Sequence, residues 1–386
     1  MELDLFTPSE VHAMVREQVS RFARERLEPR AARADEEERF DDELMRAMGS
    51  ELGMFGVTVP EDEGGAGLDM TATVIVLEEL SRVDPGFGLS YLAHELLFVH
   101  NFHSNGSKEQ KERYLPRVIS GEWLAGMAMT DPVSGSDVLA MKCTARRDGD
   151  GGYVLDGAKQ FITNAGPGRL FLTYARTGEG RRDISALLVE SDYPGFSVGR
   201  KESKLGMRSS PTCELAFEEV RVPLANLLGE ENQGLFGMMR NLEAERIGLA
   251  AQSVGIALRC VDEMVPYALE RRSFGKPLIE HGQMQRLIAE SYAHTMAART
   301  LLYQAAAHVG SGQRNRLLAD AAKLTAARVG EEVARNAIQV LGGYGYCREY
   351  PVERLLRDAI LLAIGGGTNE MMQKNICNEL KRVYSL

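Results

Sequence analysis

The residues best placed to do chemistry lie in one apolar segment, residues 237–255. Glu243, Glu245 and Arg246 are set among apolar residues that recur at helical spacing, so one face of the predicted helix is buried. Residues two apart on a helix point roughly 200° apart, so only one of the two glutamates can face a pocket. A carboxylate against apolar walls loses hydration, its pKa rises towards neutrality, and it becomes a candidate base. An ordinary Glu–Arg pair on the rim of the helix is the alternative, and this segment alone does not decide.

Composition excludes several classes of function. The chain has 386 residues, 44% of them hydrophobic and 26% charged, which is typical of a globular protein of two or three domains. A net charge of -10 without a Lys/Arg-dense run argues against nucleic-acid binding. No apolar run is long enough to span a membrane, and no signal-peptide pattern opens the chain, so we expect a cytoplasmic protein. Five scattered cysteines without CxxC, and no HExxH, predict free thiols and no metal centre. Redox chemistry would then need an organic cofactor.

The elements that must position these residues follow the order helices, strands, helices. Residues 1–122 read as helical, 123–233 as short strands with a hairpin turn at 148–152, and 234–386 as helical. We expect Thr7 to open a capping box, the first helix to end before Pro29, and a late helix to span 314–341. Strands without intervening helices predict an antiparallel sandwich or barrel, and no GxGxxG supports a Rossmann domain. The fold class is α+β.

Six phrases resemble the acyl-CoA dehydrogenase family, in the family's order and near its spacing. They are MTDPVSGSD from Met129, FITN from Phe161, KLGMR from Lys204, RRSFGK from Arg271, LGGYGY from Leu341 and GGGTNE from Gly365. Within the family the chain is most similar to isovaleryl-CoA dehydrogenases. The resemblance implies an N-terminal α-helical domain, a middle β-domain and a C-terminal four-helix bundle. It also implies FAD as cofactor, an acyl-CoA substrate, an electron-transferring flavoprotein as acceptor, and a homotetramer.

The resemblance also implies two sets of cofactor contacts. Those beside the flavin and its pyrophosphate are Met127, Met129, Thr130, Ser136, Phe161, Ile162 and Thr163. Those from other parts of the chain or a neighbouring subunit are Arg271, Gln339, Val340, Leu341, Gly342, Gly343, Thr368, Asn369 and Glu370. The family usually has a phenylalanine–glutamine pair where His281 and Gly282 stand here, with Gln283 one position later. That cofactor contact is therefore in doubt, and we expect His281 to be structural.

Many family members carry the catalytic glutamate in the loop aligned with Gly366, which cannot accept a proton. Isovaleryl-type members place it instead on the long helix in a Glu–Arg pair, which matches Glu245 and Arg246. The resemblance therefore implies that Glu245 removes the α-proton while the β-hydrogen leaves as hydride to the flavin. The implied substrate contacts are Ser136, Phe236, Glu243, Ala244, Arg246, Gly365, Gly366 and Gly367.

The acyl group is the least constrained part of the prediction. Straight-chain members commonly have a tyrosine where Gly365 stands, so the glycine predicts a branched substrate such as isovaleryl- or citronellyl-CoA, unless it serves only the turn. Two alternatives share the fold: a dehydrogenase acting on acyl groups tethered to a carrier protein, and a flavin oxidase or monooxygenase. A non-enzymatic helical assembly protein is the alternative outside this class.

Overall fold

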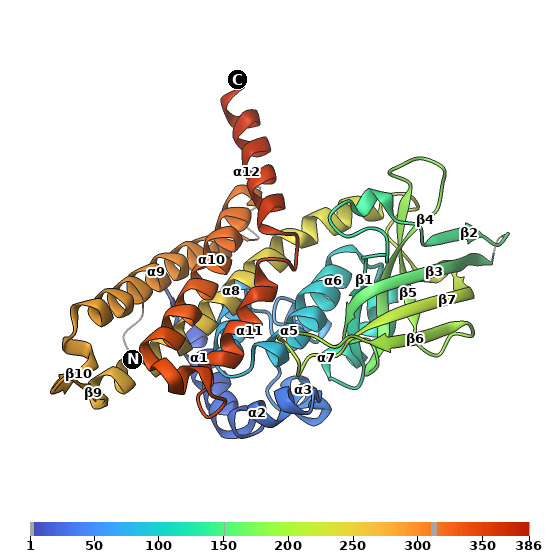
Figure 1. The fold of residues 1–386 in the computed structure, drawn as a ribbon. Helices are drawn as coiled ribbons and strands as arrows, with labels where there is room; N and C mark the ends of the chain where they lie inside the picture. The colour runs from blue at the N-terminus through green and yellow to red at the C-terminus, as the bar shows by residue number, and fades with distance from the viewer. Residues whose placement is uncertain (1–3, 150, 310–314, 386) are drawn as a thin grey trace.

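The chain folds into two helical regions and a β-sheet, and in Figure 1 the sheet lies at the right with the helices of both regions to its left. We analysed a computed structural model that describes residues 4–149, 151–309 and 315–385. The predicted order of helices, strands, helices is confirmed, and the fold is α+β. Asp150 of the predicted hairpin turn and Arg314 of the predicted late helix lie outside the described residues.

The N-terminal region is a helical layer. Its helices are α1 (Glu10–Phe22), a π-helical turn (Ala23–Leu27), α2 (Glu28–Glu36), α3 (Asp42–Ser50), α4 (Met70–Ser81), α5 (Pro85–Leu92), a π-helix (Ala93–His100), α6 (Asn101–Asn105) and α7 (Lys108–Ile119). Two expectations were wrong. Ser9, not Thr7, caps α1, and the helical path continues through Pro29 because this residue falls in the first turn of α2, just after the π-helical turn. Proline lacks a backbone N–H donor, but at this position the preceding π-helical turn leaves that donor without a helical acceptor.

The strands form one connected sheet in the order β6-β7-β3-β2-β4-β5-β8, and β1 adds to β4. They are β1 (Leu124–Ala128), β2 (Thr144–Arg147), β3 (Gly152–Thr163), β4 (Gly168–Arg176), β5 (Ile184–Glu190), β6 (Phe196–Lys201), β7 (Thr212–Pro223) and β8 (Leu227–Leu228). Adjacent hairpins pair antiparallel as expected, but β4 pairs in parallel with both β1 and β2. The sequence pattern did not show β1, whose five residues are all buried and therefore do not alternate.

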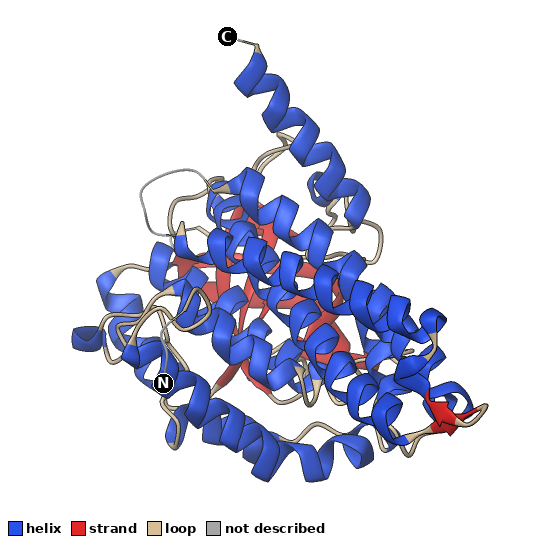
Figure 2. Cartoon of the chain, turned by 90° about the vertical axis from the view of Figure 1, so that its left-hand side faces the viewer, coloured by secondary structure: helices blue, strands red, loops and turns tan. Residues whose placement is uncertain are grey.

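The C-terminal region is built around one long helix. The helices are α8 (Gly234–Glu270), α9 (Gly282–Ala307), α10 (Arg316–Leu341), α11 (Val352–Leu362) and α12 (Asn369–Tyr384), and a small hairpin, β9 (Arg272–Ser273) with β10 (Lys276–Pro277), follows α8. Figure 2 shows these helices stacked in front of the sheet, with the C-terminal helix projecting away from the body. None of the helices in the described ranges is long and apolar enough to cross a membrane.

Helix α8 connects the three regions. Its residues from Ala244 to Ala257 are all buried. At Gly255 a Cβ would lie 2.5 Å from the carbonyl oxygen of Glu78, so a glycine lets α8 approach α4 closely. The buried His94 joins the helical layer to the sheet: its Nε2 donates to the Val118 carbonyl at 3.0 Å and its Nδ1 accepts from the Ala125 N–H at 3.0 Å. The first contact packs α8 on the N-terminal helical layer, and the His94 bonds join that layer to strand β1.

Candidate active site

Glu245 is the buried carboxylate that α8 presents to the interior. Its residue is 7% exposed, whereas Glu243 is half-buried, as expected for positions on opposite sides of a helix. Burial raises the pKa of Glu245 to about 7, against the opposing effect of the Arg246 and Lys323 charges. Its Oε2 atom has no hydrogen-bond partner among the described residues. A buried, unpartnered carboxylate that titrates near neutrality is suited to accept a proton.

The glycine loop before α12 lies directly opposite this carboxylate. A Cβ built on Gly366 would lie 3.4 Å from both Cδ and Oε1 of Glu245 and 2.3 Å from Cδ1 of Leu249. Gly366 also has φ +62°, a backbone conformation that side-chain-bearing residues rarely adopt. The loop position and the helix position therefore face one point in space, and here only the helix supplies a carboxylate.

Two buried side chains of α10 complete the surroundings of Glu245. Arg246 forms an ion pair with Asp320 at 2.8 Å, both nearly inaccessible to solvent. Lys323 donates to the Gly367 carbonyl at 2.9 Å and to Oδ1 of Asn369 at 3.3 Å. Burial lowers the pKa of Lys323 to about 8, while the nearby Glu245 charge opposes that shift. Lys323 thus ties the glycine loop to α10 beside the carboxylate.

The structure brings the two predicted flavin-edge segments together. The Lys159 ammonium donates to the Met129 carbonyl at 2.9 Å and to the Asp131 carboxylate at 2.5 Å, in a pair buried from solvent. The Gln160 N–H donates to the Thr130 carbonyl at 2.8 Å. These bonds hold the chain that follows β1 against the end of β3. Lys159 and Asp131 are therefore positioning residues that the sequence reading missed.

The same edge carries an exposed aromatic residue with a strained backbone. Phe161 has φ +58° and is 62% exposed, at a register irregularity between β3 and β7. A bulky apolar residue held in this conformation and in water is costly, and such outliers cluster at binding sites. Ile162 is buried and Thr163 half-buried, with the Thr163 carbonyl oxygen 2.7 Å from where a Cβ on Gly126 would stand. Ser136 is exposed.

Helix α8, which carries Glu245, packs against strand β5 of the same sheet. Tyr174 lies on β4 one position beyond the Ala128–Thr173 pair that joins β4 to β1. Burial raises the pKa of Tyr174, and the charge of Glu245 acts in the same direction.

The start of α12 forms another predicted contact surface. The Thr368 hydroxyl caps the helix by accepting from the Met371 N–H at 3.4 Å. Asn369 is engaged by Lys323, and Glu370 is exposed. A helix N-terminus presents backbone N–H groups that favour an anionic or polar ligand group.

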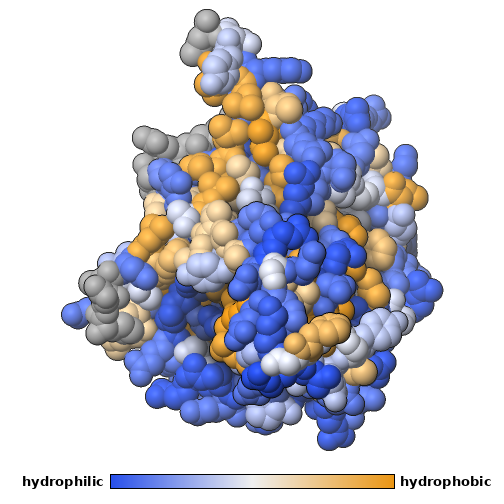
Figure 3. Space-filling view, turned by 60° about the vertical axis from the view of Figure 1, so that its left-hand side comes forward, coloured by the Kyte–Doolittle hydropathy of each residue, from blue (hydrophilic) through white to orange (hydrophobic). Residues whose placement is uncertain are grey.

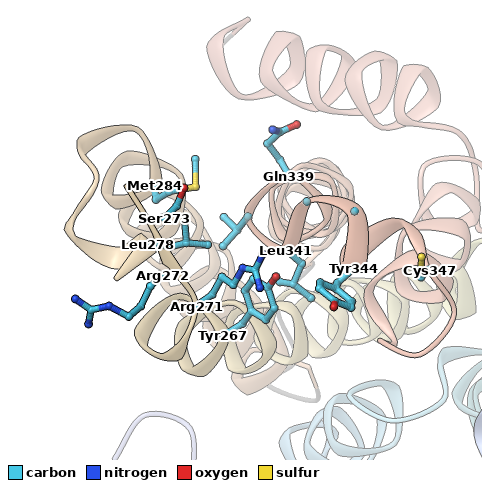
Figure 4. A pocket seen from close by; sticks show the side chains of 13 residues that line it. Tyr267, Arg271, Arg272, Ser273, Leu278, Met284, Gln339, Leu341, Tyr344 and Cys347 are labelled. Atoms are coloured by element: carbon cyan, nitrogen blue, oxygen red, sulfur yellow. The ribbon is translucent and has the colours of Figure 1, made fainter. Parts of the chain in front are cut away.

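The remaining predicted contacts line a separate surface pocket of about 640 Å³ (Figure 4). Arg271 and the run from Gln339 to Gly343 come together there with Tyr267 and Tyr344. In Figure 4 the Arg271 side chain extends towards Leu341, whereas Arg272 extends outward. A Cβ on Gly342 or Gly343 would meet no atom within 4 Å, so the backbone is open to a ligand. A guanidinium beside bare backbone N–H groups suits phosphate.

This pocket also bears on the position where the sequence departs from the family. Met284 lines it, while Gly282 and Gln283 are exposed. The His281 Nε2 bonds to the Ser273 carbonyl at 3.0 Å and thereby holds the β9–β10 hairpin, as expected of a structural residue.

The donor sets fit FAD at both of its ends. The exposed Phe161 ring, on a backbone with φ +58°, lies beside the tethered segment after β1, and an arginine with open glycine backbone lines the surface pocket. No cluster of three metal-ligating side chains occurs among the described residues, and the five cysteines are free thiols. These features suit an aromatic cofactor that carries phosphates.

The predicted substrate contacts occupy several environments. Phe236 is 64% exposed near the start of α8, Ala244 is buried, and Gly365 and Gly367 are half-buried beside Gly366. Arg246 is committed to Asp320, so a role in binding CoA stays a prediction. The sequence reading missed Asp320 and Lys323. Two charges three residues apart in the alanine-rich stretch around residues 319–327 were the available signal, because charges on an apolar helix face require buried partners.

Comparison with known proteins identifies the family. Residues 9–122, 126–220 and 232–381 match the N-terminal, middle and C-terminal domains of acyl-CoA dehydrogenases. Mitochondrial isovaleryl-CoA dehydrogenase of Oryza sativa subsp. japonica is 42% identical over 369 residues, 95% of this chain and 90% of that protein. Butyryl-CoA dehydrogenase from Megasphaera elsdenii superimposes with a TM-score of 0.95 at 34% identity, over 98% of this chain and 100% of that one. The FAD complex of PigA gives a TM-score of 0.93 at 28% identity, over 98% and 99%. The chain therefore belongs to the acyl-CoA dehydrogenase family, whose members are flavoproteins that oxidise CH–CH bonds.

Proposed function

We propose that this protein binds FAD and oxidises a branched-chain acyl-CoA to the trans-2-enoyl-CoA, with Glu245 as the base. The observation that carries the proposal is the unpartnered, buried Glu245 carboxylate facing the Gly366 loop. When bound, FAD supplies the acceptor for the hydride that leaves Cβ. The family resemblance and the geometry described above support the proposed CoA and flavin contacts.

The residues of this chain perform the proton half of the reaction. Glu245, with a pKa of about 7, is substantially ionised at neutral pH and takes the α-proton onto a carboxylate oxygen. The Gly365–Gly367 backbone, tied down by Lys323, forms the wall opposite the base and orients the thioester. Holding Cα between the base and the acceptor is a positioning effect that contributes roughly several kcal/mol to catalysis.

Gly365 supports a branched acyl group. Its φ lies outside the left-handed region, and the nearest atom to a Cβ there, the Leu361 carbonyl oxygen, is an ordinary 3.6 Å away. The backbone therefore does not require glycine at this position. Absence of a side chain leaves space beside the loop, which suits a methyl branch. The similarity to isovaleryl-CoA dehydrogenase favours a five-carbon branched substrate, with a citronellyl-like chain as the longer candidate.

The acceptor and the assembly belong to the same proposal. An electron-transferring flavoprotein is the acceptor that the family resemblance implies. A homotetramer is supported by apolar side chains exposed on the β9–β10 hairpin and the C-terminal helix, including Phe274 at 97%, Val383 at 56% and Leu380 at 39%. Figure 3 shows apolar residues gathered below and along the projecting helix. The open Arg271 pocket fits a cofactor shared between subunits.

The test is anaerobic bleaching of the purified holoprotein by a graded panel of acyl-CoAs. The proposal expects fast bleaching by isovaleryl-CoA, slower bleaching by straight butyryl- and octanoyl-CoA, and slow reoxidation in air without an acceptor protein. Preference for straight chains removes the branched assignment. Turnover only on carrier-protein thioesters, or rapid reoxidation by oxygen, identifies one of the two rival activities. A protein that takes up no FAD contradicts the proposal as a whole.

A further inference from the structure

Asn241 is a buried amide that the protein leaves without a partner. Its residue is 5% exposed, and neither Oδ1 nor Nδ2 forms a hydrogen bond with any described residue. A buried, unpaired amide costs free energy, so native proteins nearly always satisfy such groups. By contrast, the buried amide of Asn226 donates to the Leu188 carbonyl at 2.8 Å and to the Tyr193 hydroxyl at 3.0 Å. The unsatisfied amide at 241 therefore points to a ligand.

Asn241 stands one helical turn before Glu245 on α8. Residues four apart lie on the same face, separated by about 6 Å along the axis. Two polar groups without partners, the Asn241 amide and the Glu245 Oε2 atom, thus follow one another along one line of the helix. If the reacting carbon of a ligand lies at Glu245, the ligand atoms about 6 Å from that carbon lie beside Asn241.

Burial along α8 shows which part of the ligand passes Asn241. Residues 244–257 are buried without interruption, whereas Phe236 and Arg240, nearer the helix start, are exposed. An apolar acyl chain belongs on the buried side, so the polar arm of the thioester leaves towards the exposed start of α8. In an acyl-CoA the first amide nitrogen of that arm lies five bonds from Cα, about 6 Å when extended. The spacing of the two helix residues matches the spacing of the two ligand groups.

We infer that Asn241 binds the first amide of the thioester's polar arm and thereby sets Cα opposite Glu245. The inference rests on the proposed function, because it takes Glu245 as the position of the reacting carbon. An asparagine offers one donor and one acceptor side by side, which matches the N–H and C=O of a secondary amide. Asn241 is thus a positioning residue that binds substrate away from the reacting atoms.

Two truncated thioesters test the inference. One is the isovaleryl thioester of N-acetylcysteamine, which keeps the amide. The other is the S-pentyl thioester, which has the same length but no amide. For the wild-type holoprotein we expect bleaching efficiency to favour the amide by about fivefold to tenfold, the effect of one hydrogen-bonded pair. In Asn241→Leu the ratio should fall to about one, mainly through weaker binding of the amide compound.

Thermal unfolding without ligand supplies a second readout. Asn241→Leu removes an unpaired buried amide, so its melting temperature should stay equal or rise, whereas the matched Asn226→Leu should melt lower because three partners lose their bonds. An unchanged amide preference in Asn241→Leu overturns the inference and leaves a buried water as the partner of Asn241. A lower melting temperature for Asn241→Leu also contradicts it.

Failure of the proposed function is separately visible. Equilibrium binding of the two thioesters to Glu245→Gln reports the amide preference without any chemistry. If the wild type bleaches with neither thioester nor with any acyl-CoA, the proposed function fails. If it bleaches but shows no amide preference, only the assignment of Asn241 fails.

Discussion

Glu245 and Glu95 are two buried glutamates whose carboxyl groups have opposite surroundings. Burial raises the pKa of each to about 7. Glu95, in the π-helix after α5, accepts from the Gly56 N–H at 2.7 Å and the Val57 N–H at 2.8 Å. Glu245 leaves one oxygen without a partner and faces a glycine loop. Burial alone therefore does not identify the base. An oxygen without a partner and the adjacent Gly366 loop distinguish Glu245, which is why we assign it that role.

The comparison also separates the effects of pH on stability and on activity. Both carboxyls bind a proton more tightly in the folded chain than at the ordinary value of 4.5. Between about pH 4.5 and 7 the folded state holds more protons, so the contribution of both groups to stability is greatest at low pH and declines as pH rises. Activity should run the opposite way, because the proposed role of Glu245 as a base requires its ionised form.

Removing Glu95 should have the largest effect on stability. Glu95→Ala leaves the Gly56 and Val57 N–H groups buried without acceptors, and we expect a loss of about 2–4 kcal/mol in the free energy of unfolding. The bleaching rate per bound FAD should stay within about twofold of the wild type, because Glu95 does not face the site. Denaturant unfolding and stopped-flow bleaching check the two parts. A folded variant that has lost bleaching would make Glu95 part of the chemistry and break the comparison.

Moving the free carboxylate from the helix to the loop is the next largest change. Glu245→Gly combined with Gly366→Glu places a carboxylate at the same point, but the new Cβ lies 2.3 Å from Leu249 Cδ1 and the backbone has φ +62°. We expect the double variant to recover little activity because of this clash. In the triple variant, Leu249→Ala removes the clash, and we expect a rate about tenfold above that of Glu245→Gly. The recovery stays partial because the backbone strain at residue 366 persists. Single-turnover bleaching measures it. A triple variant that binds FAD yet gains nothing would refute the equivalence of the two positions.

Removing the buried ammonium beside Glu245 should change the pH profile. The Lys323 charge lowers the pKa of Glu245, whereas no charged group among the described residues shifts the pKa of Glu95. Arg246 also lowers it, and Tyr174, Asp320 and Glu370 are the other titratable groups near the pair. Lys323→Met should move the rise of the bleaching rate to higher pH and reduce the rate at pH 7 by roughly threefold to tenfold.

The same variant has a purely structural alternative. Loss of the Lys323 bonds to the Gly367 carbonyl and Asn369 would loosen the loop. That effect alone would lower the rate at every pH without moving the profile. A profile that stays in place therefore contradicts the electrostatic role of Lys323, while Lys323→Arg, which keeps the charge, should keep the wild-type profile.

Filling the space at Gly365 should have the smallest effect on stability and a measurable one on specificity. Because a Cβ meets no close atom there, Gly365→Ala should unfold within about 0.5 kcal/mol of the wild type. Gly365→Tyr should lower the preference for isovaleryl- over butyryl-CoA by roughly tenfold. That is the size of effect expected when a pocket loses the space for one methyl group. Bleaching with the two substrates measures the ratio. An unchanged ratio would assign the branch to another part of the pocket.

The order of helices and strands and the candidate base Glu245 could be predicted from the sequence. Contacts between distant elements could not. The helix carrying Glu245 was visible from spacing, and the absence of a carboxylate at Gly366 from the family pattern. The approach of Gly366 to Glu245 depends on packing between residues about 120 positions apart, which no local pattern reports. Strand β1 was missed because a fully buried strand does not alternate. Asn241, Asp320 and Lys323 were missed because their importance lies in buried partners, or in the lack of them.

The most direct test of the account is anaerobic bleaching by isovaleryl-CoA of two matched variants, Glu245→Gln and Glu95→Gln. Each should first be shown to hold FAD and to bind enoyl-CoA. The account predicts that Glu245→Gln loses about 10²–10⁴ in rate while Glu95→Gln bleaches like the wild type. Wild-type bleaching by Glu245→Gln would contradict it.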